Sequence, residues 1–174
     1  HMKIRLGGVM AGKAAQKLGI NITTVAASEL YESLQRGVID GGEFSGPKAD
    51  DSLKLQEVAP YWCAPAWYQS AGVNGVMVNM DAWNKLPEEY QTAFETAARL
   101  CCGEQLSRYI WNDMTVTNQM IEEQGVTVTS LPKEDMELIR QACLETYQEE
   151  CEINPNFKMV YDSMQAYREA ANNY

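Results

Sequence analysis

The stretch that decides the fold is residues 3–47, which read KIRLGGVMAGKAAQKLGINITTVAASELYESLQRGVIDGGEFSGP. Runs rich in β-branched residues alternate in it with runs of helical apolar spacing, and glycines separate them. The predicted elements are a strand over 4–6, a helix over 9–18 ended by Gly19, a strand over 20–26, a helix between the N-cap Ser28 and Gly37, a strand over 38–44 and a helix over about 48–58. Strands that alternate with helices predict an α/β fold, with a parallel or mixed sheet flanked by helices.

The remainder of the chain predicts mainly helices. Residues 61–68 are rich in aromatic side chains without a clear period, which leaves open either a hinge-like crossing or a pocket wall. The other predicted elements are a strand over 75–80, a long helix from Leu86-Pro87 to Gln124, a strand over 126–131, a helix to about Ile153 and a final helix after Asn154-Pro155. The final helix carries an apolar stripe formed by Phe157, Val160, Tyr161, Met164 and Tyr167.

The charge of the 174-residue chain lies in its second half. The formal net charge is −10; residues 1–87 carry eight bases and eight acids, and residues 88–174 carry six bases and sixteen acids. An acidic chain without clustered Lys and Arg is a poor partner for nucleic acid or an anionic membrane. The acids are expected on solvated helix faces.

The first two residues resemble a cloning scar joined to a start codon, so His1 is set aside. It is the sole histidine. Without it, a Ser-His-Asp triad, a Cys-His dyad and a histidine zinc site are excluded, and no enzyme is expected. No run of about 18 apolar residues predicts a membrane span, and the chain shows no secretory signal.

The five cysteines predict no disulfide framework. Their number is odd, and the neighbours Cys101 and Cys102 cannot easily bridge each other. Cys143 and Cys151 share a helical stripe with apolar residues, so we expect the cysteines to be buried free thiols. Free thiols suit a reducing compartment better than the periplasm.

A glycine-rich run after the first strand partly matches a phosphate-binding loop. Gly7 to Lys13 follow the pattern G-x4-G-K, but Ala14 stands where such a loop needs a Ser or Thr to hold magnesium. A tight strand-to-helix turn explains the glycines equally well.

A family resemblance rests on several further motifs. They are Lys3-Ile4-Arg5, Ala15-Gln16-Lys17-Leu18-Gly19, the block from Glu29 to Pro47, Tyr61-Trp62 with Pro65-Ala66-Trp67, Val78-Asn79 with Ala82-Trp83, and Asn154-Pro155 with Phe157-Lys158. Together they resemble the solute-binding proteins of tripartite ATP-independent periplasmic (TRAP) transporters, most of all the branch that binds 2-oxo acids. The resemblance implies a periplasmic-binding-protein-like lobe over 3–153 and a dimerisation helix over 154–174.

The same resemblance implies the site residues. Arg5 is expected to bind the carboxylate of a small organic acid, because a planar guanidinium matches a carboxylate. Glu43, through its carboxylate, and Phe44, through its backbone carbonyl, are expected to bind a sodium or calcium ion that bridges to the ligand. Phe44 also supplies an apolar wall. Gln69 stands where the branch has a glutamate, so it can hydrogen-bond the ligand without a charge.

The resemblance also implies that the chain corresponds to the second lobe of the family, in which the segment equivalent to residues 70–110 packs on the first lobe. One lobe cannot bury a ligand as a closed pocket does, so we expect at best millimolar carboxylate binding. The resemblance implies a periplasmic protein that serves membrane transporter subunits; if Met2 is the native start, a cytoplasmic half-length protein is expected instead.

A second hypothesis is a half-length homologue that no longer serves transport. It would be an obligate homo-oligomer, most simply a homodimer, in which partner chains cover each other's apolar faces. The stripe from Phe157 to Tyr167 would form the contact.

Overall fold

The computed structural model describes residues 2–69, 72 and 75–173. The chain forms two compact units, unit 1 from His1–Phe44, Cys63–Tyr68 and Thr129–Tyr174, and unit 2 from Ser45–Trp62 and Gln69–Val128. It passes from unit 2 to unit 1 after Trp62 and returns after Tyr68. This agrees with the crossing interpretation of the aromatic segment 61–68. Predictions for residues 1, 70–71, 73–74 and 174 lie outside the described residues.

Unit 1 is built on a three-stranded parallel sheet. Its strands are β1 (Lys3–Arg5), β2 (Asn21–Thr23) and β3 (Gly41–Gly42), in the order β2-β1-β3. Ile4 of the central strand lies opposite Ile22 on one side and Gly41 on the other. The α/β prediction is confirmed, and its parallel alternative describes this sheet.

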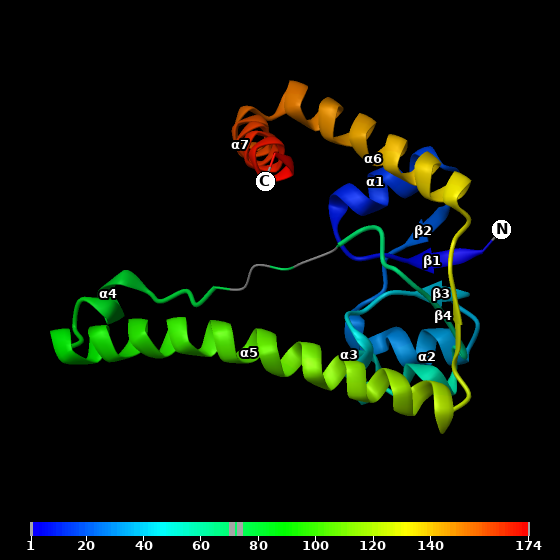
Figure 1. Ribbon diagram of the computed structural model, residues 1–174, viewed down its shortest axis with the longest axis horizontal. Helices are drawn as coiled ribbons and strands as arrows, with labels where there is room; N and C mark the ends of the chain where they lie inside the picture. The colour runs from blue at the N-terminus through cyan, green and yellow to red at the C-terminus, as the bar shows by residue number, and fades with distance from the viewer. Residues whose placement is uncertain (1, 70–71, 73–74, 174) are drawn as a thin grey trace. The chain divides into compact units, whose positions relative to one another are not determined.

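Four α-helices belong to the described part of unit 1. They are α1 (Val9–Lys17), α2 (Leu30–Gln35), α6 (Lys133–Ile153) and α7 (Pro155–Asn172), and a 3-10 turn, η1 (Ala27–Glu29), precedes α2. Helix α1 packs against α6, as Figure 1 shows. Ala14 and Ala15 are almost fully buried on α1, and their small side chains allow close packing. At the edge of this contact, Lys13 pairs with Glu150 at 2.7 Å.

Unit 2 is mainly helical. Its helices are α3 (Pro47–Ser52), the 3-10 turn η2 (Leu55–Glu57), α4 (Met80–Trp83) and α5 (Glu88–Glu122). Helix α3 packs against α5. Val116, Met120 and Val126 form a buried apolar cluster, and Trp62 packs against it. The strands β4 (Tyr61–Cys63) and β5 (Thr127–Thr129), within which the chain changes unit, pair with each other.

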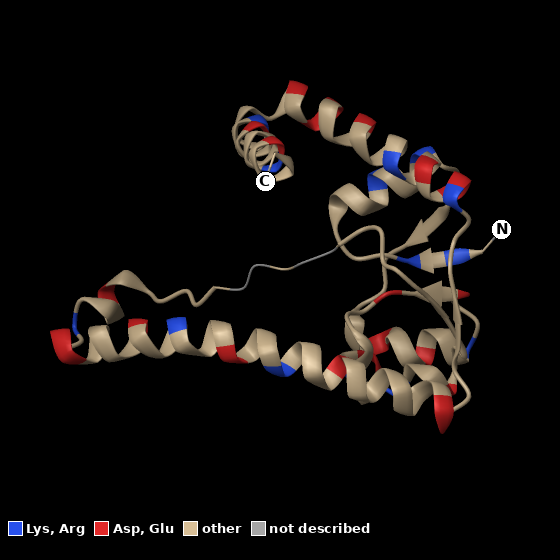
Figure 2. Ribbon diagram, in the orientation of Figure 1, with Lys and Arg blue, Asp and Glu red and all other residues tan. Residues whose placement is uncertain are grey.

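The two long helices predicted after Pro87 are confirmed within two residues at each end. Helix α5 ends at Glu122, and α6 begins directly after Pro132. The final helix is confirmed as well, and the Asn154 side chain caps it by accepting from the amides of Asn156 and Phe157. All but one of the sixteen acids of the second half lie on α5, α6 and α7, and Glu123 directly follows α5 (Figure 2).

The predicted strand over 38–44 is wrong in length. Only Gly41 and Gly42 pair as β3. The amides of Val38 and Ile39 both donate to the carbonyl of Ser33, at 2.9 and 3.3 Å, and so they close the end of α2. An amide used in this way is not available to a strand ladder, and the strand therefore begins later than its β-branched residues suggest.

Three other local predictions are wrong. Residues 75–79 form no strand, and Met80 begins α4, where Asn79 caps the helix. The helix predicted over 48–58 stops at Ser52, because Lys54 adopts a left-handed conformation with φ 59°. The Ser28 side chain caps no helix, since it lies inside η1.

The cysteines are free, as predicted, but not all are buried. Cys63, Cys101 and Cys102 are exposed, and Cys143 and Cys151 are half-buried. The burial of Cys143 raises the pKa of its thiol. The prediction of buried thiols failed for Cys101 and Cys102 because the middle of α5 is not covered by other described parts of unit 2.

Candidate functional site

Arg5 is the last residue of the central strand of unit 1. In parallel α/β sheets, ligands bind beyond the carboxyl ends of the strands, which is where this residue stands. Its side chain is only 15% exposed. The Nε–H donates to the carbonyl of Val25 at 3.3 Å, and Nη1 donates to both the backbone carbonyl and the carboxylate of Glu43. The guanidinium is therefore held in a fixed orientation.

Glu43 directly follows β3, so the parallel pairing brings it to the same edge of the sheet as Arg5. Its side chain is 12% exposed, and Oε2 lies 3.1 Å from Nη1 of Arg5. Oε1 accepts from the backbone N–H of Gly7 at 2.6 Å. Each carboxylate oxygen thus has one strong donor, and the resulting charged hydrogen bonds fix the carboxylate.

Gly7 lies close to the Glu43 carboxylate in its present position. A Cβ atom on residue 7 would collide with Oε1 of Glu43. The following residue, Gly8, has φ 86° at the start of α1, a conformation that favours glycine. The amide that a phosphate loop would offer to a phosphate is used by a carboxylate here. The geometry thus supports the tight-turn interpretation of the glycine-rich run.

Phe44 is half-buried and follows Glu43 in the chain. A carboxylate and a backbone carbonyl are ligand types that sodium and calcium accept, and calcium takes six to eight oxygens. The donors at Glu43 and Phe44 fit such an ion in kind and supply only part of its shell. In the part of the chain that the structure describes, no three His, Cys, Asp or Glu residues are grouped to hold a metal.

Gln69 is exposed and belongs to unit 2, whereas Arg5, Glu43 and Phe44 belong to unit 1. Within unit 1 the structure brings Arg5 and Glu43 together, and Phe44 directly follows Glu43. The preceding aromatic pair, Trp67 and Tyr68, is arranged edge to face with ring centres 5.5 Å apart.

Sequence reasoning missed two groups that orient the site. They are the amide of Gly7 and the carbonyl of Val25, which bind Glu43 and Arg5. The Gly7-Gly8 turn was a usable signal, because a glycine opposite a predicted site residue suggests a close backbone approach. Nothing in the sequence marks the carbonyl of Val25, since every residue carries one.

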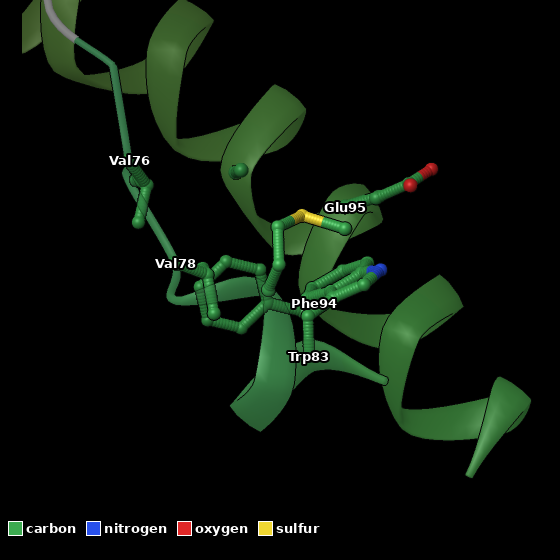
Figure 3. Close-up of a pocket in the computed structure, with 7 residues that line it drawn as sticks. Val76, Val78, Trp83, Phe94 and Glu95 are labelled. Atoms are coloured by element: carbon green, nitrogen blue, oxygen red, sulfur yellow. The ribbon is translucent and has the colours of Figure 1, made fainter. Parts of the chain in front are cut away.

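Unit 2 contains a separate apolar hollow between the segment before α4 and the first part of α5 (Figure 3). Trp83 and Phe94 line it, with ring centres 5.7 Å apart and nearly perpendicular planes. The remaining lining residues are Val76, Val78, Met80, Glu95 and Ala98. The hollow has one charged side chain, so its shape and chemistry suit apolar side chains better than an organic acid.

None of the described helices is long and apolar enough to cross a membrane.

Comparison with known proteins gives a consistent result. A monocarboxylate 2-oxoacid-binding periplasmic protein of Nostoc sp. is 30% identical over 168 residues, which are 96% of this chain and 45% of that protein. A TRAP transporter solute-binding protein from Bordetella bronchiseptica, with calcium and picolinate bound, has a TM-score of 0.87 and 31% identity over 99% of this chain and 51% of its own.

A TRAP periplasmic solute-binding protein from Colwellia psychrerythraea, with bound calcium and pyruvate, has a TM-score of 0.86 and 28% identity. The match covers 99% of this chain and 52% of that one. All three relatives are described as binding proteins, which agrees with the prediction that no enzyme is present.

This chain spans about half the length of the relatives that it matches. The family of bacterial extracellular solute-binding proteins, family 7 (DctP), matches residues 1–153. Since the match covers most of the chain, this protein belongs to the DctP family of solute-binding proteins.

Proposed function

We propose that this chain is one lobe of a TRAP-type solute-binding protein for small organic acids such as 2-oxo acids. The observation that carries the proposal is the identity of 30% over 96% of the chain to a monocarboxylate 2-oxoacid-binding protein. The two similar structures hold picolinate and pyruvate, both small carboxylates, and each also holds calcium. The proposal places the ligand at the edge of the unit 1 sheet.

Arg5 is the proposed anchor for the ligand's carboxylate. It is a mostly buried cation whose orientation is set by Val25 and Glu43. An oriented guanidinium binds a carboxylate through two parallel N–H groups, and each charged hydrogen bond contributes roughly 1.5–3 kcal/mol. In the proposal, Gln69 adds a neutral hydrogen-bonding group to ligand recognition.

Glu43 and Phe44 are the proposed ligands of a sodium or calcium ion. The ion would be held by the carboxylate of Glu43 and the backbone carbonyl of Phe44, and it would supply a positive charge beside the organic acid. Part of its shell must then come from the ligand, from water or from other protein segments, because these two residues provide too few oxygens.

The proposal is tested by titration of pyruvate with calcium present, measured by calorimetry. We expect dissociation constants in the millimolar range, about −4 kcal/mol, since one lobe leaves much of the ligand exposed. Arg5→Lys keeps the charge and loses the planar fork, so it is expected to weaken binding about tenfold. Arg36→Lys is the matched control, because Arg36 is 71% exposed and pairs with Glu32 on the surface of α2. Equal binding by wild type and Arg5→Lys would contradict the proposed anchor.

The apolar surface formed by residues 75–80 and the first part of α5 is the second element of the proposal. It comprises the hollow at Trp83 and Phe94 and exposed side chains that include Leu100, Leu106 and Ile110. The relatives are about twice as long as this chain. We assign this surface, with the segment 70–110, to contact with the other lobe of a complete receptor in the periplasm, which would deliver its ligand to membrane transporter subunits.

A homodimer is the second candidate, and α7 favours it. Phe157 and Tyr161 pack against Tyr147 of α6, with ring centres 6.3 and 5.9 Å from that of Tyr147. Val160, Met164 and Tyr167 of the same helix are exposed. Three large apolar residues within eight positions are typical of a helix that packs on a second surface. Light scattering that shows monomer alone at high concentration would exclude this candidate.

A further inference from the structure

The two side chains proposed to bind opposite charges bind each other in this structure. Arg5 is the proposed site for an anion and Glu43 the proposed site for a cation, yet their side chains form an ion pair at 3.1 Å. Both are largely withdrawn from solvent. Nη1 of Arg5 also donates to the backbone carbonyl of Glu43, so Glu43 accepts two hydrogen bonds from this nitrogen.

We propose that Glu43 is an internal counter-ion of Arg5, which the ligand's carboxylate must replace, and that a bound cation releases it. The inference rests on the proposed function, and it adds the means by which cation and acid binding are coupled. In this arrangement Glu43 lowers the affinity for an organic acid when no cation is present. It therefore enlarges the gain in that affinity when the cation binds.

The hydrogen-bond donors of Arg5 support an exchange. A carboxylate binds a guanidinium through two N–H groups on neighbouring nitrogens, either Nε with Nη2 or Nη1 with Nη2. Nε donates its hydrogen to Val25, and the two hydrogens of Nη1 go to the carbonyl and the carboxylate of Glu43. Either two-point mode for the ligand therefore breaks an existing bond. The Glu43 carboxylate is the partner that a cation can draw away.

A cation at Glu43 would favour the exchange. A positive ion beside the carboxylate offsets its charge and weakens its attraction for Arg5. The ligand's carboxylate then meets a guanidinium with less competition. Because coupling between two binding equilibria is reciprocal, the acid must raise the affinity for the cation by the same factor.

Gly7 is the positioning residue of this device. Its N–H holds Oε1 of Glu43 at 2.6 Å, and its lack of a side chain leaves room for the carboxylate. The Gly7 amide keeps Oε1 fixed while Oε2 of the same carboxylate faces Arg5. Gly7→Ala would displace the carboxylate without removing its charge, so it should disturb the ion pair as Glu43→Gln does, though less selectively.

The experiment measures how accessible Arg5 is, without depending on any solute. Glyoxal condenses with guanidinium groups, and the modification rate of each arginine is followed by mass spectrometry of the intact chain and its peptides. Wild type is compared with Glu43→Gln, which keeps the shape and loses the charge. Asp40→Asn is the matched control, because exposed Asp40 accepts from the amide of Lys3 and the change removes one negative charge on the same segment.

We expect glyoxal to modify Arg5 several-fold faster in Glu43→Gln than in wild type. In Asp40→Asn the modification rate of Arg5 should equal that in wild type. Calcium chloride should raise the rate for Arg5 in wild type and leave it unchanged in Glu43→Gln. The rate at exposed Arg36 calibrates the reagent in every sample. Equal or slower modification of Arg5 in Glu43→Gln overturns the proposal.

A second arm titrates pyruvate into chelator-treated protein in a choline buffer. Glu43→Gln is expected to bind pyruvate about tenfold more tightly than wild type there, as the loss of one charged competitor implies. With calcium, wild type should gain affinity and Glu43→Gln should not. Weaker binding by Glu43→Gln without calcium overturns the proposal. If pyruvate binds to neither protein while the glyoxal rates differ as expected, the internal counter-ion stands and the 2-oxo acid function fails.

Discussion

The two ends of helix α5 have the same kind of side chains and opposite environments. Toward the C-terminal end, Val116 and Met120 are 7% and 5% exposed and pack with Val126 and Trp62. In the first two thirds of the helix, large apolar side chains face outward. Trp111 there is 68% exposed. The members of this outward-facing set are Tyr90, Phe94, Leu100, Leu106, Tyr109, Ile110 and Trp111.

This difference shows that the sequence of a helix does not itself say what covers it. A helix that contacts one surface carries a single apolar stripe, and one that is covered on several sides is apolar around its circumference. At 100° per residue, Phe94, Leu100 and Leu106 lie about 120° apart around α5, and all three are exposed. The first part of α5 therefore has the pattern of a covered helix, while the described residues of its unit leave it exposed.

The largest effect is expected at the covered end. Met120→Ala removes a buried side chain from the cluster with Val116 and Val126, and it should lower the free energy of unfolding by about 2–5 kcal/mol. Met114→Ala is the matched control on the same helix, because Met114 is 57% exposed. Its change should be within about 0.5 kcal/mol. Urea denaturation measures both, and equal losses would remove the distinction between the two ends.

The uncovered end should control association instead of stability. Leu106→Glu together with Ile110→Glu places charges on the exposed surface of α5. The free energy of unfolding should change by less than about 1 kcal/mol, because surface substitutions away from a packed contact have small effects. Binding of a hydrophobic dye and self-association in light scattering should both fall. A large loss of stability would show that this surface is covered within the chain.

An intermediate test concerns the hollow at the beginning of α5. Trp83→Ala removes the edge-to-face contact with Phe94 and should loosen α4 from α5 by about 1 kcal/mol. Hydrogen exchange at residues 80–86 should become about fivefold faster, while exchange at 114–122 stays constant. Met77→Ala, at a fully exposed neighbour, is the control. Unchanged exchange over 80–86 would mean that the aromatic contact does not hold α4.

The smallest effect is expected for a polar contact on a covered helix. The hydrogen bond from Lys13 lowers the pKa of Glu150, and the charge of Lys13 acts in the same direction. A carboxyl group with a lowered pKa in the folded state stabilises above its unfolded pKa, and this contribution is lost as the pH falls through the folded pKa. Wild type should therefore have a slightly higher Tm than Glu150→Gln at pH 7, and the two values should converge as the pH falls through the lowered pKa of Glu150 in the folded state.

Exposed Glu152, on the same helix, gives the control variant Glu152→Gln. A difference between wild type and Glu150→Gln that persists at pH 2.5 would contradict an electrostatic origin. In that case the buried apolar side chains would account for the stability of the covered helices, and the Lys13–Glu150 ion pair would not contribute.

The sequence predicted well those elements whose signals are local. Gly19 and Gly37 adopt positive φ after α1 and α2, and Pro132 and Asn154 directly precede α6 and α7. The wrong predictions concern elements that depend on contacts with residues distant in the sequence. The apolar run Val76-Met77-Val78 lies in a segment predicted as a strand, but an extended segment needs a neighbour to pair with, and the described residues show no such pairing there.

The candidate site shows the same limit. Arg5 and Glu43 could be named from motifs, and the parallel order of the strands explains why both stand at one edge of the sheet. Their mutual ion pair could not be predicted, because it depends on where two side chains end after the sheet has formed. Gln69 remains a prediction from resemblance.

The third strand of the sheet also constrains how the site can be redesigned. A Cβ on Gly42 would lie 2.7 Å from Cδ1 of Leu30, and one on Gly41 would lie 3.0 Å from Cδ1 of Ile4. A side chain at either position would thus have to displace the end of the Leu30 or Ile4 side chain. In a library that seeks new solutes for a sensor, diversity belongs at residues that face the ligand, and the Gly41-Gly42 pair should be held constant because a side chain there would disturb the strand that precedes Glu43.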